Sequence, residues 1–415
     1  MKILHTADWH LGNVFHGHNR IGEHRHFLAW LLDTLKEECP DVLVIAGDIF
    51  DSPNPSAAAE EMFYNFLIDA SEAVMGMQIV AIAGNHDSAG RIDAPAQLLK
   101  RHNIHVRGTL PRNTETGEVD FDRLIIPLSH RSTTDAQAVC LAVPYLRPSD
   151  YPMGMNNGEG MRDLFDKLLY KVKKSNLRGL PIIAVAHFYA AGAEISENEH
   201  SERLVVGGQD CIAANVIDPS VCYTALGHLH KAQSIKSAAG EMQYAGSPIP
   251  LSFSESHYKH GVTLIEIDNE EKVNTQRIPY TPLRQLTTLP PHGSATPLDI
   301  LRMIEKLPKR GRNDEGEAWP YLELKVEEKQ PEPTLLHQIT TSLEDKAVYF
   351  CRVVRVYQQD HTATTAHKTS NTLQTLTPIE MADLIYQDKY KSPLPDELKQ
   401  RLLIAEEYSL SESLQ

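Results

Sequence analysis

The sequence predicts a layered α/β domain that is followed by a small α+β module and a helical tail. Three observations support this fold class. Over roughly the first 270 residues, short apolar runs alternate with longer stretches of helical periodicity. Farther along, two helical patterns surround a segment that alternates apolar and charged residues. The chain then passes through a polar tract into another amphipathic stretch.

Apolar runs in the first part of the chain predict strands. They are too short for helices and apolar nearly throughout, as expected of strands that are buried on both faces. We expect these strands at residues 3–7, 42–46, 79–83, 182–186 and 223–226. Between the first two we expect a helix that ends at Cys39-Pro40. Its apolar face is made by Phe27, Leu28, Leu31, Leu32 and Leu35.

The second part, residues 281–357, predicts a small α+β module. Residues 322–327 alternate apolar and charged side chains, which predicts a half-exposed strand, and residues 348–357 predict a second strand. Helical patterns at residues 298–307 and 334–343 lie around the first of these strands. The polar residues that follow, up to 376, predict a linker.

The end of the chain is predicted to be helical. Thr377 and Glu380 form a capping box with Pro378 at the first helical position, which is a signal for a helix start. Short amphipathic helices at a chain end are marginal unless they pack on another surface. The predicted domain boundaries are therefore residues 1–280, 281–357, 358–376 for the linker and 377–415 for the tail.

Composition sets limits on the function. The 415 residues carry a formal net charge of −15, which does not indicate a nucleic-acid binder, but local basic patches and bound cations are not counted in it. The five cysteines form no C-x-x-C pair, so we expect neither a disulfide framework nor a cysteine zinc site. The N-terminus lacks a secretory apolar region, and no run approaches the ~18 apolar residues of a membrane span. We therefore expect a cytoplasmic protein with no membrane partner.

Potential metal ligands follow each of the predicted strands. They are Asp8 and His10, then Asp48 and Asp51, then Asn85, His86 and Asp87, then His187, and last His228 and His230. In open α/β sheets, ligands bind beyond the carboxyl ends of the strands, so strands that lie side by side would bring these residues to one cleft. On an extended strand, residues two apart face the same side, which would pair Asp8 with His10. Glycines 47, 84 and 227 would let the backbone turn where each strand ends.

These side chains suit a centre of two cations. Carboxylate, imidazole and amide oxygen favour Mn, Mg, Fe or Zn over a thiolate-binding ion, and Asp48 could bridge two metals. Two metals about 3.5–4 Å apart are the clamp used for in-line displacement at phosphorus. Taken singly, an Asp-x-His is usually a surface feature and Gly-Asn-His-Asp can cap a helix. Their joint occurrence at successive strand ends favours a metal-dependent phosphoesterase.

The motif set Asp-x-His, Gly-Asp-x-x-Asp, Gly-Asn-His-Asp, a single His and Gly-His-x-His resembles the calcineurin-like metallophosphoesterases, over roughly residues 1–265. Residues 1–12, 225–233 and 246–253 are similar to the corresponding segments of the SbcD nucleases within that superfamily. The resemblance implies a layered β-sandwich flanked by helices, with a small α+β capping domain and C-terminal helices.

The resemblance also implies roles for the candidate residues. One divalent cation, usually Mn²⁺ with Mg²⁺ as the alternative, would be held by Asp8, His10, Asp48 and His230. The second would be held by Asp48, Asn85, His187 and His228. His86 would lie near the scissile phosphate and stabilise its charge or protonate the leaving oxygen. Asp51 and Asp87 would support these residues from outside the ligand set.

The SbcD resemblance implies a nuclease that degrades double-stranded DNA ends in the 3′–5′ direction and opens hairpins and single strands endonucleolytically. Such nucleases work with a coiled-coil ATPase, SbcC, in DNA end processing, replication, recombination and repair. The module at 281–357 would contact DNA, and the tail beyond Thr377 would dock on the ATPase. Helices near residues 20–35 and 55–75 would form a homodimer.

Two alternatives stay open. The metal motif alone would also suit a small-substrate phosphodiesterase or a nucleotidase, although such an enzyme has little use for a partner-docking tail. A non-catalytic DNA-binding module could keep the metals for structure, but a purely structural site has no need of His86. The chain has no Walker-type loop and no Gly-x-Ser-x-Gly elbow, so ATP hydrolysis would require a partner and a serine hydrolase is not expected.

Overall fold

The computed structural model describes residues 1–194, 211–235, 240–268, 270–312, 316–328 and 332–357, with seven residues of the tail (383, 386, 394, 395, 398, 399 and 401). The chain divides into two compact units, Met1–Tyr357 and Gln358–Gln415. The linker predicted at 358–376 and the capping box predicted at Thr377 lie outside the described residues. In the part of the chain that is described, no helix is both long and apolar enough to cross a membrane.

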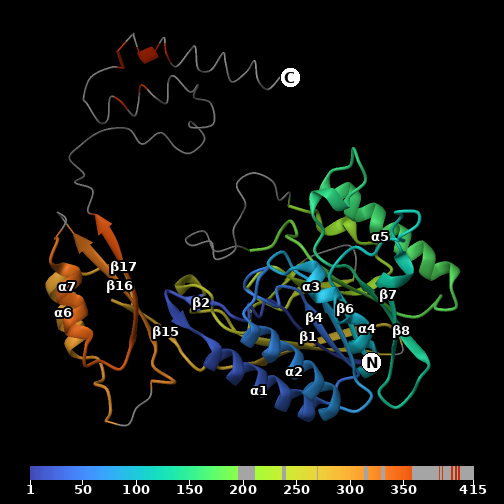
Figure 1. Ribbon diagram of the computed structural model, residues 1–415, viewed down its shortest axis with the longest axis horizontal. Coiled ribbons are helices and arrows are strands. Elements are labelled where there is room, and N and C mark those ends of the chain that lie inside the picture. The colour runs from blue at the N-terminus through green and yellow to red at the C-terminus, as the bar shows by residue number, and fades with distance from the viewer. Residues whose placement is uncertain are drawn as a thin grey trace. The chain divides into compact units, whose positions relative to one another are not determined.

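Two six-stranded sheets form the centre of the first unit (Figure 1). The first has the order β14-β13-β1-β4-β5-β6, and β1, β4, β5 and β6 are parallel to one another. Its strands are β1 (Lys2–Thr6), β4 (Val42–Ala46), β5 (Gln78–Ile82), β6 (Ile104–Arg107), β13 (Gly261–Ile267) and β14 (Val273–Pro279). All residues of β4 and β5 are buried, as their apolar sequences predict.

The second sheet has the order β11-β12-β10-β9-β8-β7, with β8, β9, β10 and β12 parallel. Its strands are β7 (Ile125–Ser129), β8 (Ala136–Ala142), β9 (Ile182–His187), β10 (Val221–Gly227), β11 (Gln233–Ile235) and β12 (Glu241–Tyr244). The strands predicted from the sequence all form, but they are divided between the two sheets. The predicted strands therefore do not lie side by side in one open sheet.

The two sheets pack face to face. Val42, Val44 and Val80 of the first sheet meet Ile183 and Val185 of the second in one apolar layer. Each large apolar side chain that is buried in this way contributes about 1.5–3 kcal/mol. The layered β-sandwich flanked by helices is thus confirmed.

Helices cover the outer faces of both sheets. Helices α1 (Ile21–Glu38) and α2 (Ala57–Ala73) cover the first sheet, where Phe27 and Phe63 enter the core. Helix α5 (Asn157–Lys174) covers the second sheet.

The predicted end of the first helix, α1, is confirmed, because Cys39 leaves it in a left-handed conformation. The shorter elements are β2 (Val14–Phe15), β3 (His18–Asn19), α3 (Ala89–Asp93) and α4 (Ala96–Leu99), with 3₁₀ turns at Lys100–His102, Phe121–Leu124, Pro148–Asp150, Ala214–Val216 and Phe253–Glu255.

Side chains that accept backbone N–H groups set where several helices begin. Ser56 accepts from Ala59 at the start of α2, and Asn156 accepts from Glu159 at the start of α5. Such caps satisfy donors that the first helical turn leaves without a partner, and each contributes about 1 kcal/mol.

The α+β module contains a parallel sheet of order β15-β16-β17, with two helices that pack on each other over one of its faces (Figure 1). Its elements are β15 (Leu286–Leu289), α6 (Pro297–Glu305), β16 (Tyr321–Glu328), α7 (Leu335–Leu343) and β17 (Tyr349–Tyr357). The predicted helices and strands are confirmed, whereas β15 was not predicted. The polar face of β16 is more buried than predicted, because Glu323 is only 1% exposed and is paired with Arg352.

Buried polar contacts join the module to the sandwich within the first unit. Glu23 on α1 forms a two-point ion pair with Arg20, at 2.7 and 2.9 Å. The hydroxyl of Tyr321, at the start of β16, donates to the same Glu23 carboxylate at 2.7 Å. Arg284 donates to the Tyr321 hydroxyl at 2.9 Å, and Arg20 donates to the carbonyl of Pro250 at 2.7 Å. Paired and hydrogen-bonded in this way, the buried charges are satisfied.

Candidate metal centre

Carboxylate and imidazole groups gather at the carboxyl ends of strands from both sheets. Asp8, His10 and Asp48 offer ligand atoms that all lie within 4.8 Å of one another. Asp48, His187 and His228 form a second group that meets the same criterion. Because Asp48 belongs to both groups, its carboxylate lies where it could bridge two cations.

Several of these residues have an unusual backbone conformation. Asp8, His10 and Asp48 have positive φ angles of 55°, 46° and 48°, and His228 has 103°. Asp8 and His10 therefore lie beyond the end of β1, and strand alternation is the wrong reason for their pairing. Left-handed conformations of non-glycine residues cost about 1–3 kcal/mol each and are concentrated at functional sites.

Backbone hydrogen bonds join the loop that follows β1 to the loop that follows β4. The N–H of Asp8 donates to the carbonyl of Gly47 at 3.0 Å, and the N–H of His10 donates to the carbonyl of Asp48 at 3.1 Å. The loops that follow β1 and β4 therefore support each other. This arrangement brings three carboxylate and imidazole side chains to one point.

Glycines beside these residues are needed for two different reasons. Gly47 has a φ of 92°, which favours glycine. At Gly84 the constraint is space, because a Cβ atom there would lie 2.1 Å from Oδ1 of Asp48. At Gly227 a Cβ atom would lie 2.0 Å from the carbonyl oxygen of Ala46. The expectation that all three glycines serve sharp turns thus holds for Gly47, and close approach explains the other two.

Asn85 lies between the two histidines of the second group. Its Oδ1 atom is 3.0 Å from Nε2 of His187 and 3.0 Å from Nδ1 of His228. On the other side of its ring, His187 donates from Nδ1 to the carbonyl of Ala46 at 2.8 Å. Nε2 of His187 faces Oδ1 of Asn85 and Oδ2 of Asp48, and the latter atom is 3.3 Å away.

His230 lies beside the first group. Its ring packs against that of His10, with the centroids 5.2 Å apart. Its Nδ1 atom is 3.0 Å from Oε1 of Glu255. The structure thus brings the seven predicted ligands together, with His230 and Asn85 at the edges of the two groups.

The unsatisfied atoms and charges of the centre fit divalent cations. Oδ2 of Asp8 and both ring nitrogens of His10 are buried without a hydrogen-bond partner. Buried polar atoms without partners cost about 1–3 kcal/mol each, and a cation would satisfy Oδ2 of Asp8 and one of the two nitrogens of His10. The donor set of carboxylate, imidazole and amide oxygen suits a hard or borderline ion.

Burial and mutual proximity shift the acidities within the centre. Burial raises the pKa of Asp8 to about 7. Burial alone would lower the pKa of His187, but the neighbouring Asp48 carboxylate raises it to about 9. Burial and the nearby His187 lower the pKa of His228 to about 3. Burial opposes ionisation of Asp48, but His187 holds the pKa of that carboxyl well below its usual range.

His86 adjoins the centre. It donates from Nδ1 to the carbonyl of Asp51 at 2.9 Å, and its ring lies 4.8 Å from that of His10, centroid to centroid. Its backbone N–H donates to Oδ1 of Asp48 at 2.9 Å. His86 is thus held next to the first group and is partly exposed.

Asp87 and Asp51 contact the loops and ligands of the centre from the side. The buried Asp87 carboxylate accepts the backbone N–H groups of Ile49, Phe50 and Gly84 at 3.1, 2.9 and 2.8 Å. It therefore ties together the loops that follow β4 and β5. Oδ1 of Asp51 lies 3.5 Å from Nδ1 of His10.

Glu255 is a residue of this region that the sequence did not indicate. Its side chain is 2% exposed in the 3₁₀ turn Phe253–Glu255, where it contacts His230. No predicted strand ends beside it, so the pattern that revealed the other residues does not include it. The available signal was its position two residues beyond the segment 246–253 that resembles the SbcD nucleases.

Comparison with known proteins gives two family matches. Residues 1–232 match the family described as Calcineurin-like phosphoesterase. Residues 279–390 match the family described as Type 5 capsule protein repressor C-terminal domain.

Similar proteins carry the name of the SbcD subunit of the SbcCD nuclease. The one from Rhodobacter capsulatus is 37% identical over 356 residues, which cover 83% of this chain and 84% of that protein. The one from Bacillus subtilis is 35% identical and covers 67% of this chain and 69% of its own. The one from Escherichia coli K12 is 32% identical, with 68% and 69% covered.

Proposed function

We infer the function from the family: the chain belongs to the calcineurin-like phosphoesterases and, within them, to the group of the SbcD components of SbcCD nucleases. We propose that it hydrolyses phosphodiester bonds of DNA and works with an SbcC-type ATPase. The observation that carries the proposal is the pair of ligand groups that share Asp48.

Two divalent cations, Mn²⁺ in preference to Mg²⁺, would occupy this centre. Asp8, His10, Asp48 and His230 would hold one, and Asp48, Asn85, His187 and His228 the other. When bound, the cations supply a hydroxide near neutral pH and neutralise charge on the phosphate oxygens. The protein contributes the buried carboxylates of Asp8 and Asp48, and Oδ2 of Asp8, which has no hydrogen-bond partner, favours cation binding.

His86 would act on the leaving group. Because Nδ1 donates to the carbonyl of Asp51, Nε2 on the opposite side of the ring is the nitrogen that would act. From there it would donate a proton to the leaving oxygen or stabilise charge on the phosphate. General acid catalysis of this kind contributes about 10²–10⁴-fold. Asp51 would thus position His86 through its carbonyl and His10 through its carboxylate.

The other parts of the chain would serve DNA and partner binding. We propose residues 1–280 as the nuclease domain and residues 281–357 as a capping domain that contacts the DNA backbone. Residues 358–376 would link these to a tail, 377–415, that docks on the ATPase. With that partner, the proposed activities are 3′–5′ degradation of double-stranded ends and endonucleolytic opening of hairpins and single strands.

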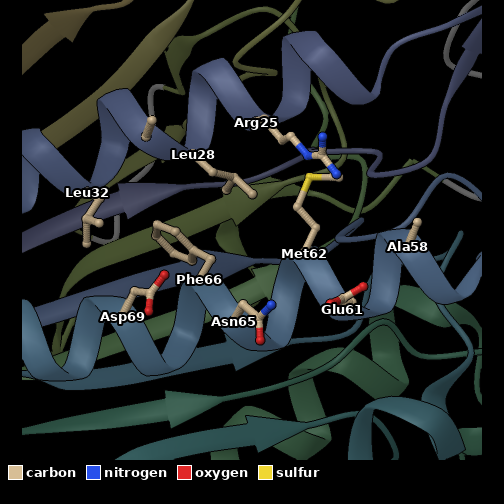
Figure 2. Close-up of a pocket in the computed structure, with 10 residues that line it drawn as sticks. Arg25, Leu28, Leu32, Ala58, Glu61, Met62, Asn65, Phe66 and Asp69 are labelled. Carbon is tan, nitrogen blue, oxygen red and sulfur yellow. The ribbon is translucent and has the colours of Figure 1, made fainter.

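The groove between α1 and α2 supports a homodimer. Figure 2 shows Leu28 and Leu32 of α1 facing Met62 and Phe66 of α2, with charged side chains at the edges. The groove has a volume of about 350 Å³. Its edges carry both signs of charge, Arg25 on α1 and the acidic Glu61 and Asp69 on α2. A second copy related by a two-fold axis could match each charge with its opposite, as isologous interfaces require.

The nuclease proposal is tested with the full chain, linear double-stranded DNA and bis-p-nitrophenyl phosphate, with and without Mn²⁺. Manganese-dependent degradation of DNA, stimulated by the ATPase partner, is the expected result. Hydrolysis of the small diester while DNA stays intact even beside the partner would instead indicate a small-substrate phosphodiesterase. No hydrolysis of either substrate, with Mn²⁺ bound, would indicate a non-catalytic binding module.

A further inference from the structure

Both carboxylate oxygens of Glu255 accept hydrogen bonds beside the metal centre. Oε1 accepts from Nδ1 of His230 at 3.0 Å, and Oε2 accepts the backbone N–H of Leu251 at 2.8 Å. The side chain is 2% exposed, and the contact with His230 is buried. A carboxylate accepts only, so Nδ1 of His230 carries the proton.

We propose that Glu255 is a positioning residue that sets the cation affinity of one of the two sites, the one made by Asp8, His10, Asp48 and His230. The inference rests on the two-cation centre of the proposed function. With the proton fixed on Nδ1, the lone pair of His230 is on Nε2, at the opposite side of the ring. A carboxylate that accepts a hydrogen bond from one imidazole nitrogen orients the ring. It also raises the basicity of the other nitrogen, which binds the metal.

The support behind the histidines differs between the two sites. In the first site, His230 contacts the carboxylate of Glu255, and His10 lies 3.5 Å from the carboxylate of Asp51. In the second, His187 donates from Nδ1 to a neutral acceptor, the carbonyl of Ala46. A neutral acceptor orients the ring but polarises it less than a carboxylate does. Loss of Glu255 should therefore weaken the first site and leave the second.

The segment that carries Glu255 is itself held in place. Arg20 is fully buried and donates to the carbonyl of Pro250 at 2.7 Å. Glu23 pairs with the same Arg20, and Phe253 packs in an apolar cluster with Phe15. The carboxylate therefore sits on an anchored support and can hold the ring of His230 in one orientation.

A glutamine at this position would reverse the polarity of the contact. Its amide oxygen would accept the N–H of Leu251, as Oε2 does now. Its NH₂ group would then face Nδ1 of His230, and this donor favours a lone pair on Nδ1. The proton would move to Nε2, the nitrogen that is to bind the cation. Glu255→Gln thus changes the tautomer of His230 while it keeps the size of the side chain.

The test is Mn²⁺ binding to the full chain by isothermal titration calorimetry, with the bound ions counted by electron paramagnetic resonance. We expect two sites in the unsubstituted chain and, in Glu255→Gln, a loss of about 10–100-fold in the affinity of one site alone. Nitrogen NMR of histidine-labelled, metal-free protein should show the change of tautomer at His230. The matched control is Glu323→Gln, another buried carboxylate, which pairs with Arg352 in the module and should leave both sites unchanged.

The experiment distinguishes failure of the proposed function from failure of this inference. If the unsubstituted chain binds fewer than two cations, the proposed function and this inference both fail. If it binds two and Glu255→Gln binds them equally well, or loses both equally, this inference alone fails. The double variant His230→Ala with Glu255→Gln should bind as His230→Ala does, and a further loss would contradict a role through His230. If Glu255→Gln does not fold, Glu255→Asp, which withdraws the carboxylate from His230, gives the same comparison.

Discussion

The hydroxyl of Tyr321 donates a 2.7 Å hydrogen bond to Oε2 of Glu23, a residue 298 positions earlier in the chain. Both side chains are completely buried. Glu23 belongs to the first long helix of the sandwich and Tyr321 to the central strand of the α+β module. One hydrogen bond therefore joins the interiors of two parts that the sequence separates widely.

Tyr321→Phe should loosen this junction. The change keeps the ring but removes the only hydroxyl hydrogen that Tyr321 can donate to Glu23. We expect a loss of about 1–3 kcal/mol in the free energy of unfolding, because a buried acceptor loses a donor. Urea unfolding followed by circular dichroism measures it. Tyr170→Phe, at a tyrosine that is 63% exposed on α5, is the control and should change nothing. Equal unfolding midpoints for Tyr321→Phe and the unsubstituted chain would contradict the role of this bond.

His86→Ala should separate catalysis from cation binding. If His86 acts on the leaving group, DNA hydrolysis should fall about 10²–10⁴-fold, while two Mn²⁺ ions still bind. Rates on linear DNA and calorimetric Mn²⁺ titration measure the two effects. His337→Ala, at an exposed histidine on α7, is the matched control. Loss of a cation together with activity would make His86 a ligand rather than a catalytic residue.

Gly84→Ala should damage the centre although it replaces none of the proposed ligands. The new methyl group would lie 2.1 Å from Oδ1 of Asp48, so this carboxylate must move away from its shared position. We expect Mn²⁺ affinity to fall at both sites, as seen by calorimetry. Gly90→Ala is the control, because no atom lies within 4 Å of a Cβ there and the position is helical. It should be neutral or stabilise the protein by up to about 1 kcal/mol. Normal Mn²⁺ binding by Gly84→Ala would show that Asp48 has room to adjust.

Asp41→Asn should change how stability depends on pH. Burial opposes ionisation of Asp41, but the backbone N–H groups of Lys2 and Arg131 and the ring of His130 hold its pKa below the usual range. A lowered folded-state pKa contributes stability above the unfolded value, about 3.9, and this contribution is lost as the pH falls through the folded-state pKa.

At pH 7 the Asp41→Asn variant should therefore be less stable by about 1–3 kcal/mol, and the difference should shrink as the pH falls below about 4. Urea midpoints at pH 7 and pH 3 provide the measurement. A difference that stays constant between these pH values would mean that the charge of Asp41 is not responsible. Asp33→Asn, on an exposed carboxylate of α1, is the control.

Met62→Glu should disrupt the proposed homodimer. Met62 is partly buried in the groove of Figure 2, so a second copy would cover it and a buried charge without a partner would oppose association. Sedimentation velocity should show the unsubstituted chain as a dimer and the variant as a monomer. Met75→Glu is the control, because Met75 is 83% exposed beyond the end of α2. A dimer that persists in Met62→Glu would place the interface elsewhere.

The candidate ligands could be predicted because each follows an apolar run, and such runs are visible in a sequence. Their division between two sheets could not, because a strand buried on both faces has the same composition in either sheet. Val44 and Val185 illustrate this, since they come from similar apolar runs and meet from opposite sheets. Contacts between residues far apart in the sequence could not be predicted either. Glu255 follows no strand, and the contact of Tyr321 with Glu23 joins residues whose positions in sequence are unrelated.

The positive φ angles of Asp8, His10, Asp48 and His228 have a consequence for how this protein can change. Glycine at any of these positions would relax the backbone and at the same time delete a candidate ligand. Folding and chemistry therefore make opposite demands on the same four residues, and both cannot be optimised together. Selection for thermal resistance alone would erode the centre, and only continued selection for activity would retain it.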